Sequence, residues 1–250
     1  MQTQLLQKAI HPTTANFPGT LLLASVDFAF QNKKSQLLNK DKIQICPQQI
    51  GQLTEGVATK LKNKYANTDF HLHANVNILS QRFVFDASCD WNNEDVQKYV
   101  KKLKLLNDAF GKNLYSYHAG RRVCSLQDMI DNAMRLQDYL DTEVVIEGLY
   151  PEKRNVWLIS SLDEYEWLSS KTSFVLDLSH LQIVFEQEKK EIDYAWVKEM
   201  MEHKNCKEIH ISSNDGEHDS HKVLMGNEWW IDILKQSDTK ASIFTEENFK

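Results

Sequence analysis

Glycine, proline and cysteine are scarce in this chain, and each shortage bears on the class of protein. Eight glycines and four prolines in 250 residues argue against a disordered or linker-rich chain. The four cysteines, Cys46, Cys89, Cys124 and Cys206, lie far apart and form no CxxC pair. Reduced thiols, as in a cytoplasmic protein, are therefore expected.

Long apolar runs and excess positive charge are also missing. No apolar stretch approaches the roughly 20 residues of a membrane span, and the N-terminus lacks the basic and apolar regions of a signal peptide. The formal net charge of −6 gives no support to a nucleic-acid footprint. We therefore expect a cytoplasmic protein that neither spans a membrane nor takes nucleic acid as its partner.

Strand-like and helix-like segments alternate along the chain, which is typical of a parallel sheet. A short helix is expected over Met1–Ile10. Eight strands are expected at Thr20–Phe30, Lys42–Cys46, Asp69–Asn75, Leu114–His118, Glu143–Glu147, Ser173–Leu178, Lys207–Ser212 and Ala241–Thr245. The intervening helices are expected at Leu53–Lys64, Asn93–Phe110, Ser125–Leu140, Leu162–Leu168, Ile192–His203 and Glu228–Gln236.

Eight such units in 250 residues favour one closed (β/α)8 TIM barrel over residues 1–250. An open doubly wound sheet is the rival, but no glycine-rich phosphate turn follows the first strand. The chain stops four residues after Glu246, so we expect no helix after the last strand. The N-terminal segment or a partner subunit would then cover that side of the barrel.

Residues with metal-binding side chains fall at the ends of six successive expected strands. In a barrel these ends face one rim, so the side chains can converge there. The predicted metal ligands are His73, His118, Glu147, Asp177, His180, His210, Asp219, His221 and Glu246. Imidazole and carboxylate suit zinc, iron or manganese, and nine ligands exceed what one ion needs. We therefore predict two or three clustered divalent ions, with Glu147 well placed to bridge them.

Most of the other polar residues near this rim have two interpretations. Arg121 and Arg122 follow His118 and either bind a substrate carboxylate or phosphate or lie in a solvated loop. Asn75 either orients ligands and substrate or caps its loop. His71 is expected to be a hydrogen-bonded core residue, and His218 either supports a ligand or is exposed. Alternation does not decide whether Glu246 or Glu247 points inward.

Four motifs resemble the xylose-isomerase-like TIM-barrel superfamily. They are the Glu of VVIEG, the D-x-x-H of LDLSH, the strand-end His of EIHIS and the final Glu of IFTEEN. The stretches LQDYLDTEVVIEGLYP, SLDEYEWL and ASIFTEENF and the D-x-H of HDSH are similar to the multinuclear non-haem iron-dependent oxidases of the methanobactin-biosynthesis type. The chain departs from them in having EG where they usually have EN, His180 where many have Asn, and no C-terminal helix.

The resemblance implies three functions, ranked in order. The first is an iron-dependent oxidase that acts on a peptide or a small polar or thiol substrate, with iron the leading metal and zinc or manganese the alternatives. The second is a phosphodiesterase similar to endonuclease IV, because HANVNIL and DSHKVLMG resemble it although its Cys-containing D-T-C-H motif is absent. The third is a sugar isomerase or epimerase. Glu147, Glu246 and His180 are the expected catalytic residues, and all three functions need Glu147.

Overall fold

The computed structural model describes the backbone of residues 10–12. It also describes residues 42–45, 53–73, 78–79, 83–152, 156–222 and 228–246. Eight strands form one parallel sheet whose neighbours follow the order β1-β8-β7-β6-β5-β4-β3-β2. The strands are β1 Ile10–Pro12, β2 Lys42–Ile45, β3 Asp69–His73, β4 Tyr115–His118, β5 Val144–Glu147, β6 Phe174–Asp177, β7 Cys206–Ile211 and β8 Ser242–Thr245.

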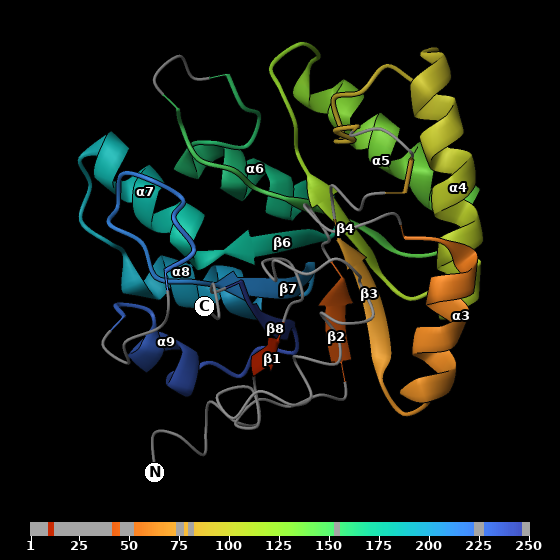
Figure 1. The fold of residues 1–250 in the computed structure, drawn as a ribbon. Helices are drawn as coiled ribbons and strands as arrows, with labels where there is room; N and C mark the ends of the chain where they lie inside the picture. The colour runs from red at the N-terminus through yellow and green to blue at the C-terminus, as the bar shows by residue number, and fades with distance from the viewer. Residues whose placement is uncertain are drawn as a thin grey trace.

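The sheet curves into a nearly closed barrel. Its two end strands, β1 and β2, lie next to each other, and the helices lie around the outside of the strands (Figure 1). The helices are α3 Glu55–Lys64, α4 Glu94–Phe110, α5 Leu126–Leu140, α6 Leu162–Lys171, α7 Leu178–Glu188, α8 Tyr194–Glu202 and α9 Ile231–Gln236. The predicted fold class, a (β/α)8 TIM barrel, is confirmed, and no helix lies between β8 and the last described residue, Glu246.

Local sequence explains why these elements begin and end where they do. The Asn93 side chain accepts from the backbone of Asp95 and Val96 and so caps the start of α4, and Gly111 ends α4 at a φ of 96°, which glycine adopts without cost. Ser125 and Asp128 form a reciprocal capping box at the start of α5. The buried side chains of α4, such as Val96, Val100 and Leu103, recur every three or four residues and face the strands.

One predicted element needs correction, and one helix was not predicted. The strand that pairs with β8 begins at Ile10, a residue expected to end a helix. Pro12 lies in this strand, since a strand at the end of a sheet tolerates proline. The expected first strand, Thr20–Phe30, lies outside the described residues. The sequence also missed α7 altogether, because its residues from Leu178 to Phe185 are nearly all buried and so lack an amphipathic period.

The core consists of apolar side chains that come from the strands and from the helices around them. Phe70, Tyr115 and Phe174 point from strands and are fully buried, and Leu103 and Leu136 meet this core from α4 and α5. Among the described helices none is long and apolar enough to cross a membrane. The barrel thus provides rigid strands whose carboxyl ends can hold a site.

Candidate metal centre

Strand register brings the predicted ligands side by side at the carboxyl ends of the strands. His118 of β4 pairs with Glu147 of β5, and Asp177 of β6 pairs with His210 of β7. The backbone N–H of Glu246, just after β8, donates to the carbonyl oxygen of Ile211 at 3.0 Å, which places Glu246 beside the end of β7. The ligand-type residues are therefore neighbours in space although they come from separate strands.

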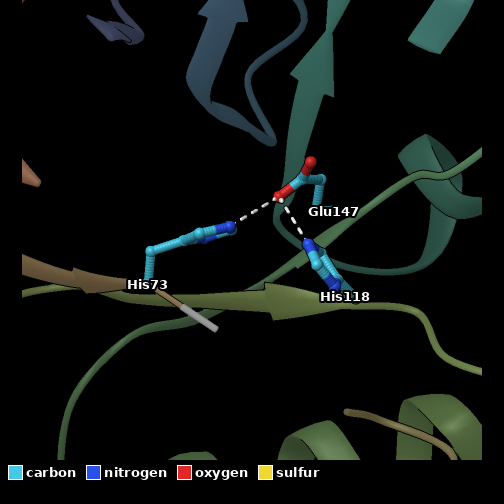
Figure 2. A group of neighbouring side chains, drawn as sticks. All are labelled: His73, His118 and Glu147. Carbon is cyan, nitrogen blue, oxygen red and sulfur yellow. Dashed lines mark ion pairs between the residues drawn. The ribbon is translucent and has the colours of Figure 1, made fainter. Parts of the chain in front are cut away.

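Glu147 lies at the centre of the cluster. Its Oε2 atom is 3.2 Å from Nε2 of His73, 3.8 Å from Nε2 of His118 and 3.5 Å from Nδ1 of His210. Its Oε1 atom is 3.5 Å from Nδ1 of His180. Figure 2 shows the two imidazoles of His73 and His118 pointing at one carboxylate oxygen from neighbouring strands. Imidazole rings therefore lie near both oxygens of Glu147, which puts this carboxylate at the centre of the cluster.

A second group forms around Glu246. Its Oε1 atom is 3.2 Å from Nδ1 of His210, and its Oε2 atom is 3.6 Å from Nδ1 of His221. Ligand atoms of Glu147, Asp177, His210 and Glu246 all lie within 4.8 Å of one another, as do those of His73, His210 and Glu246. These are separations that one ion can span, since metal–ligand bonds to nitrogen and oxygen are about 2.0–2.2 Å long.

A third carboxylate, Asp219 in the loop after β7, lies between two imidazoles. Its Oδ2 atom is 3.4 Å from Nε2 of His180 and 3.1 Å from Nε2 of His221. His221 has a φ of 43°, a left-handed conformation that is uncommon outside glycine and recurs at functional sites. The structure thus brings together all nine residues predicted as ligands; their binding of metal stays a prediction.

The helix start at α7 orients two of these residues. Oδ1 of Asp177 accepts from the backbone N–H groups of Ser179 and His180 at 2.7 and 2.9 Å, so Asp177 caps α7 and its Oδ2 atom remains for the rim. Nδ1 of His180 lies 2.9 Å from the carbonyl oxygen of Gly148. Because that nitrogen faces the backbone, Nε2 of His180 is the one turned to Asp219.

The carboxylates of the cluster face imidazoles. Glu147, Asp177 and Asp219 form no ion pair with a Lys or Arg among the described residues. Buried atoms without a hydrogen-bond partner include Oε2 of Glu147, Oδ2 of Asp177 and Nδ1 of His210. Such atoms are costly unless something pairs with them, and the donor set fits divalent cations.

The pKa values reflect this crowding. Burial alone would raise the pKa of Glu147, but His73, His210 and His118 outweigh it and hold that pKa far below its usual range. Burial, opposed by Glu147, lowers the pKa of His73 to about 4. Burial also raises the pKa of Asp177 despite His180. Neighbouring groups pushed in opposite directions are typical of functional sites.

Sequence reasoning missed the residues that support the ligands from inside the barrel. Glu208 is fully buried; its Oε1 atom lies 2.6 Å from Nδ1 of His71, and its Oε2 atom lies 3.4 Å from Nε2 of His210. The Gln44 amide nitrogen lies 3.0 Å from the same Nε2, and the Ser116 hydroxyl lies 2.9 Å from Nδ1 of His73. Alternation along β7 was a usable signal, because Glu208 and His210 must face the same way.

The other candidate residues lie apart from the cluster or outside the described residues. Arg122 pairs with both carboxylate oxygens of Glu164, at 2.7 and 2.8 Å, and the Arg121 guanidinium lies over the Trp157 ring. His218 is exposed and near Asp215. Asn75 and Glu247 lie outside the described residues. Substrate binding by Arg121, Arg122 and Asn75 stays a prediction.

Comparison with known proteins supports the fold. No family model matches the chain, and no curated protein matches it. The chain is similar to a solved AP endonuclease, family 2, from Brucella melitensis, with a TM-score of 0.65 and 11% identity over 96% of this chain and 93% of that one. It is also similar to a xylose isomerase-like TIM barrel/4-hydroxyphenylpyruvate dioxygenase fusion protein, with a TM-score of 0.57 and 12% identity over 97% of this chain and 39% of that one. These likenesses show a shared TIM-barrel fold.

Proposed function

We propose that the rim cluster holds two or three divalent metal ions and that the protein is a metal-dependent enzyme. The observation that supports this most is the set of buried ligand atoms on Glu147, Asp177 and His210 that have no hydrogen-bond partner. Buried carboxylates such as Glu147, Asp177 and Asp219, whose charged partners among the described residues are imidazoles, are stabilised by bound cations. Because Glu147 meets imidazoles at both of its oxygens, it is the residue proposed to bridge two ions.

Iron-dependent oxidation is our first candidate activity. Two of the groups, His73 with His118 and Glu147, and His73 with His210 and Glu246, each combine two imidazoles with one carboxylate. That combination with open positions is typical of non-haem ferrous oxygenases, whereas zinc and manganese are the alternative metals. Bound iron supplies the electron-transfer and oxygen chemistry that side chains lack.

The chain's own residues have the remaining tasks in this proposal. Glu147 and Glu246 neutralise the ions, and His180, 3.4 Å from Asp219, orients that carboxylate. The Tyr150 ring lies against the His180 ring, with centroids 4.9 Å apart, and forms part of the wall that a peptide or small polar substrate would contact. Convergence of all nine ligand-type residues argues against the isomerase interpretation. An isomerase of this type would rely on four of them alone, namely Glu147, Asp177, His210 and Glu246.

A phosphodiesterase is the second candidate. The likeness to a family 2 AP endonuclease extends over nearly the whole chain, and ions that share a carboxylate can clamp both oxygens of a displacement at phosphorus. The net charge of −6 disfavours duplex DNA as the substrate.

Air-free purification followed by two assays separates these candidates. Oxygen uptake by the ferrous protein, with a change in its visible absorption, is the result expected for an oxidase. Efficient incision of an abasic-site duplex by zinc-loaded protein, with a steep salt dependence, is the result that would replace it with the phosphodiesterase. Protein that binds no divalent ion under either condition would contradict the proposed function as a whole.

A further inference from the structure

A layer of polar side chains lies inside the barrel, one step below the ligand-type residues. It consists of Gln44, His71, Ser116 and Glu208, none of which is more than 6% exposed. His71, Ser116 and Glu208 each come two residues before a ligand-type residue of the same strand, so they point to the same side of the sheet as those ligands. Bulky aliphatic side chains usually fill this part of a TIM barrel, and buried polar groups are costly unless they are paired. These four residues therefore depend on the contacts that they make with one another and with the ligands.

Gln44 joins two sides of this layer. Its amide nitrogen donates to Oε2 of Glu208 at 2.9 Å and to the Ser116 hydroxyl at 3.2 Å, and it lies 3.0 Å from Nε2 of His210. Ser116 belongs to β4 and Glu208 to β7, and neither strand is a neighbour of β2 in the sheet. Both hydrogen bonds therefore cross the barrel interior, and Gln44 connects strands that carry different ligands.

The layer contacts two histidines of the cluster at opposite ring nitrogens. The Ser116 hydroxyl lies 2.9 Å from Nδ1 of His73, and Nε2 of that ring lies 3.2 Å from Oε2 of Glu147. The arrangement is reversed in His210, where Nε2 lies 3.4 Å from Oε2 of Glu208 and Nδ1 lies 3.5 Å from the same oxygen of Glu147. A neutral imidazole carries its proton on one nitrogen and offers the lone pair of the other to a metal. The contacts below each ring therefore determine which nitrogen faces the rim.

We propose that Gln44 and Ser116 are positioning residues for the metal centre. Ser116 holds His73 so that this ring binds metal through Nε2. Gln44, together with Glu208, holds His210 so that it binds through Nδ1. Because Gln44 bonds to both Ser116 and Glu208, it links the orientations of the two rings. The inference rests on the proposed function, since it concerns how the ligands meet the ions.

Long-range proton–nitrogen NMR spectra of zinc-loaded protein with isotope-labelled histidine test the ring orientations. Zinc has a filled d shell, so it leaves the spectra free of paramagnetic broadening. His73 should carry its proton on Nδ1 and the metal on Nε2, and His210 should show the reverse. His73→Gln and His210→Gln proteins identify the two sets of signals by their loss. Metal on the same type of nitrogen in both rings would overturn the inference.

Zinc affinity, measured by competition with a chromophoric chelator, tests the positioning role. Gln44→Leu and Ser116→Ala should each weaken the affinity by about 10–100-fold, the usual effect of losing a partner behind a ligand. The double variant should lose less than the product of the two single losses, because residues in one hydrogen-bonded network are not additive. Asn107→Leu is the matched control. It also removes a buried amide, one that donates to the Leu140 carbonyl oxygen at 3.3 Å, and it should lower the melting temperature without changing zinc affinity.

Failure of this inference is distinguishable from failure of the proposed function. Unchanged zinc affinity in Gln44→Leu and Ser116→Ala proteins would overturn the positioning role and leave the metal centre in place. Losses that multiply fully in the double variant would contradict the link through Gln44. Unaltered protein that binds no zinc would contradict the proposed function itself, and the inference with it.

Discussion

Glu208 and His71 form a buried carboxylate–imidazole pair beneath the metal cluster, with Oε1 of Glu208 2.6 Å from Nδ1 of His71. The other oxygen of Glu208 lies 3.4 Å from Nε2 of His210, whose Nδ1 faces Glu147 and Glu246. A carboxylate behind a ligating imidazole fixes the orientation of the ring and the nitrogen that is left for the metal. Glu208 is therefore a positioning residue for His210.

Glu208→Gln should weaken metal affinity by about 10–100-fold, the usual cost of losing such a partner. Metal content at saturating concentrations should stay the same, because the ligands themselves remain. The measurement is a competition titration against a chromophoric chelator. Glu143→Gln, which changes an exposed carboxylate near Lys207, is the control. A lower melting temperature with unchanged metal affinity would reduce Glu208 to a structural role.

His180→Ala should remove one metal ion from the cluster and leave the others. Its imidazole lies 3.4 Å from Asp219 and 3.5 Å from Glu147, so its loss removes a ligand near Asp219 while the group of His73, His210 and Glu246 keeps all its members. Plasma emission on purified protein gives the metal count. His218→Ala, a change at an exposed histidine of the same loop region, should have no effect. Full metal content with only a raised KM would favour an isomerase.

Much of the barrel and the cluster follows from the sequence because both depend on strand order. Parallel strands end at one rim, so His73, His118 and Glu147 were predictable as neighbours without any knowledge of packing. By contrast, α7 is buried on most sides, so its sequence has no amphipathic pattern that would predict a helix. Pairing of Ile10 with Ile243 is a contact between opposite ends of the chain, which no local pattern specifies.

Gly148→Ala should destabilise the protein by about 1–3 kcal/mol, the usual cost of overpacking. A Cβ at this position would lie 2.2 Å from Cε1 of Tyr165, and the Tyr165 hydroxyl is held by its bond to the Leu149 carbonyl oxygen at 2.9 Å. This packing also gives a physical reason for Gly after Glu147 in place of Asn. Thermal unfolding measures the effect.

Gly56→Ala is the matched control for that substitution. Gly56 lies in the first turn of α3, where an added Cβ would meet only the Thr54 hydroxyl at 3.9 Å. Alanine is the better helix former by up to about 1 kcal/mol, so unfolding should be unchanged or shifted upward. Equal destabilisation by both changes would contradict the close approach of Tyr165.

Cys89 should react slowly with iodoacetamide at pH 8. Burial, reinforced by the charge of Asp86, raises the pKa of its thiol to about 12, so the reactive thiolate is rare at that pH. Because the raised pKa keeps the thiol protonated, the thiolate fraction and the alkylation rate should both rise about tenfold per pH unit up to pH 10. Mass spectrometry of the alkylated peptide gives the rate, and a plateau near pH 9 would exclude the shift.

The central claim is that Glu147 holds two metal ions together, and the metal content of Glu147→Gln protein tests it most directly. Gln keeps the volume and removes the charge that meets imidazoles at both oxygens. Plasma emission on air-free preparations should give two or three ions per chain for the unaltered protein. The variant should contain at least one ion fewer, with the same far-ultraviolet circular dichroism. The same metal content in both proteins would contradict the account.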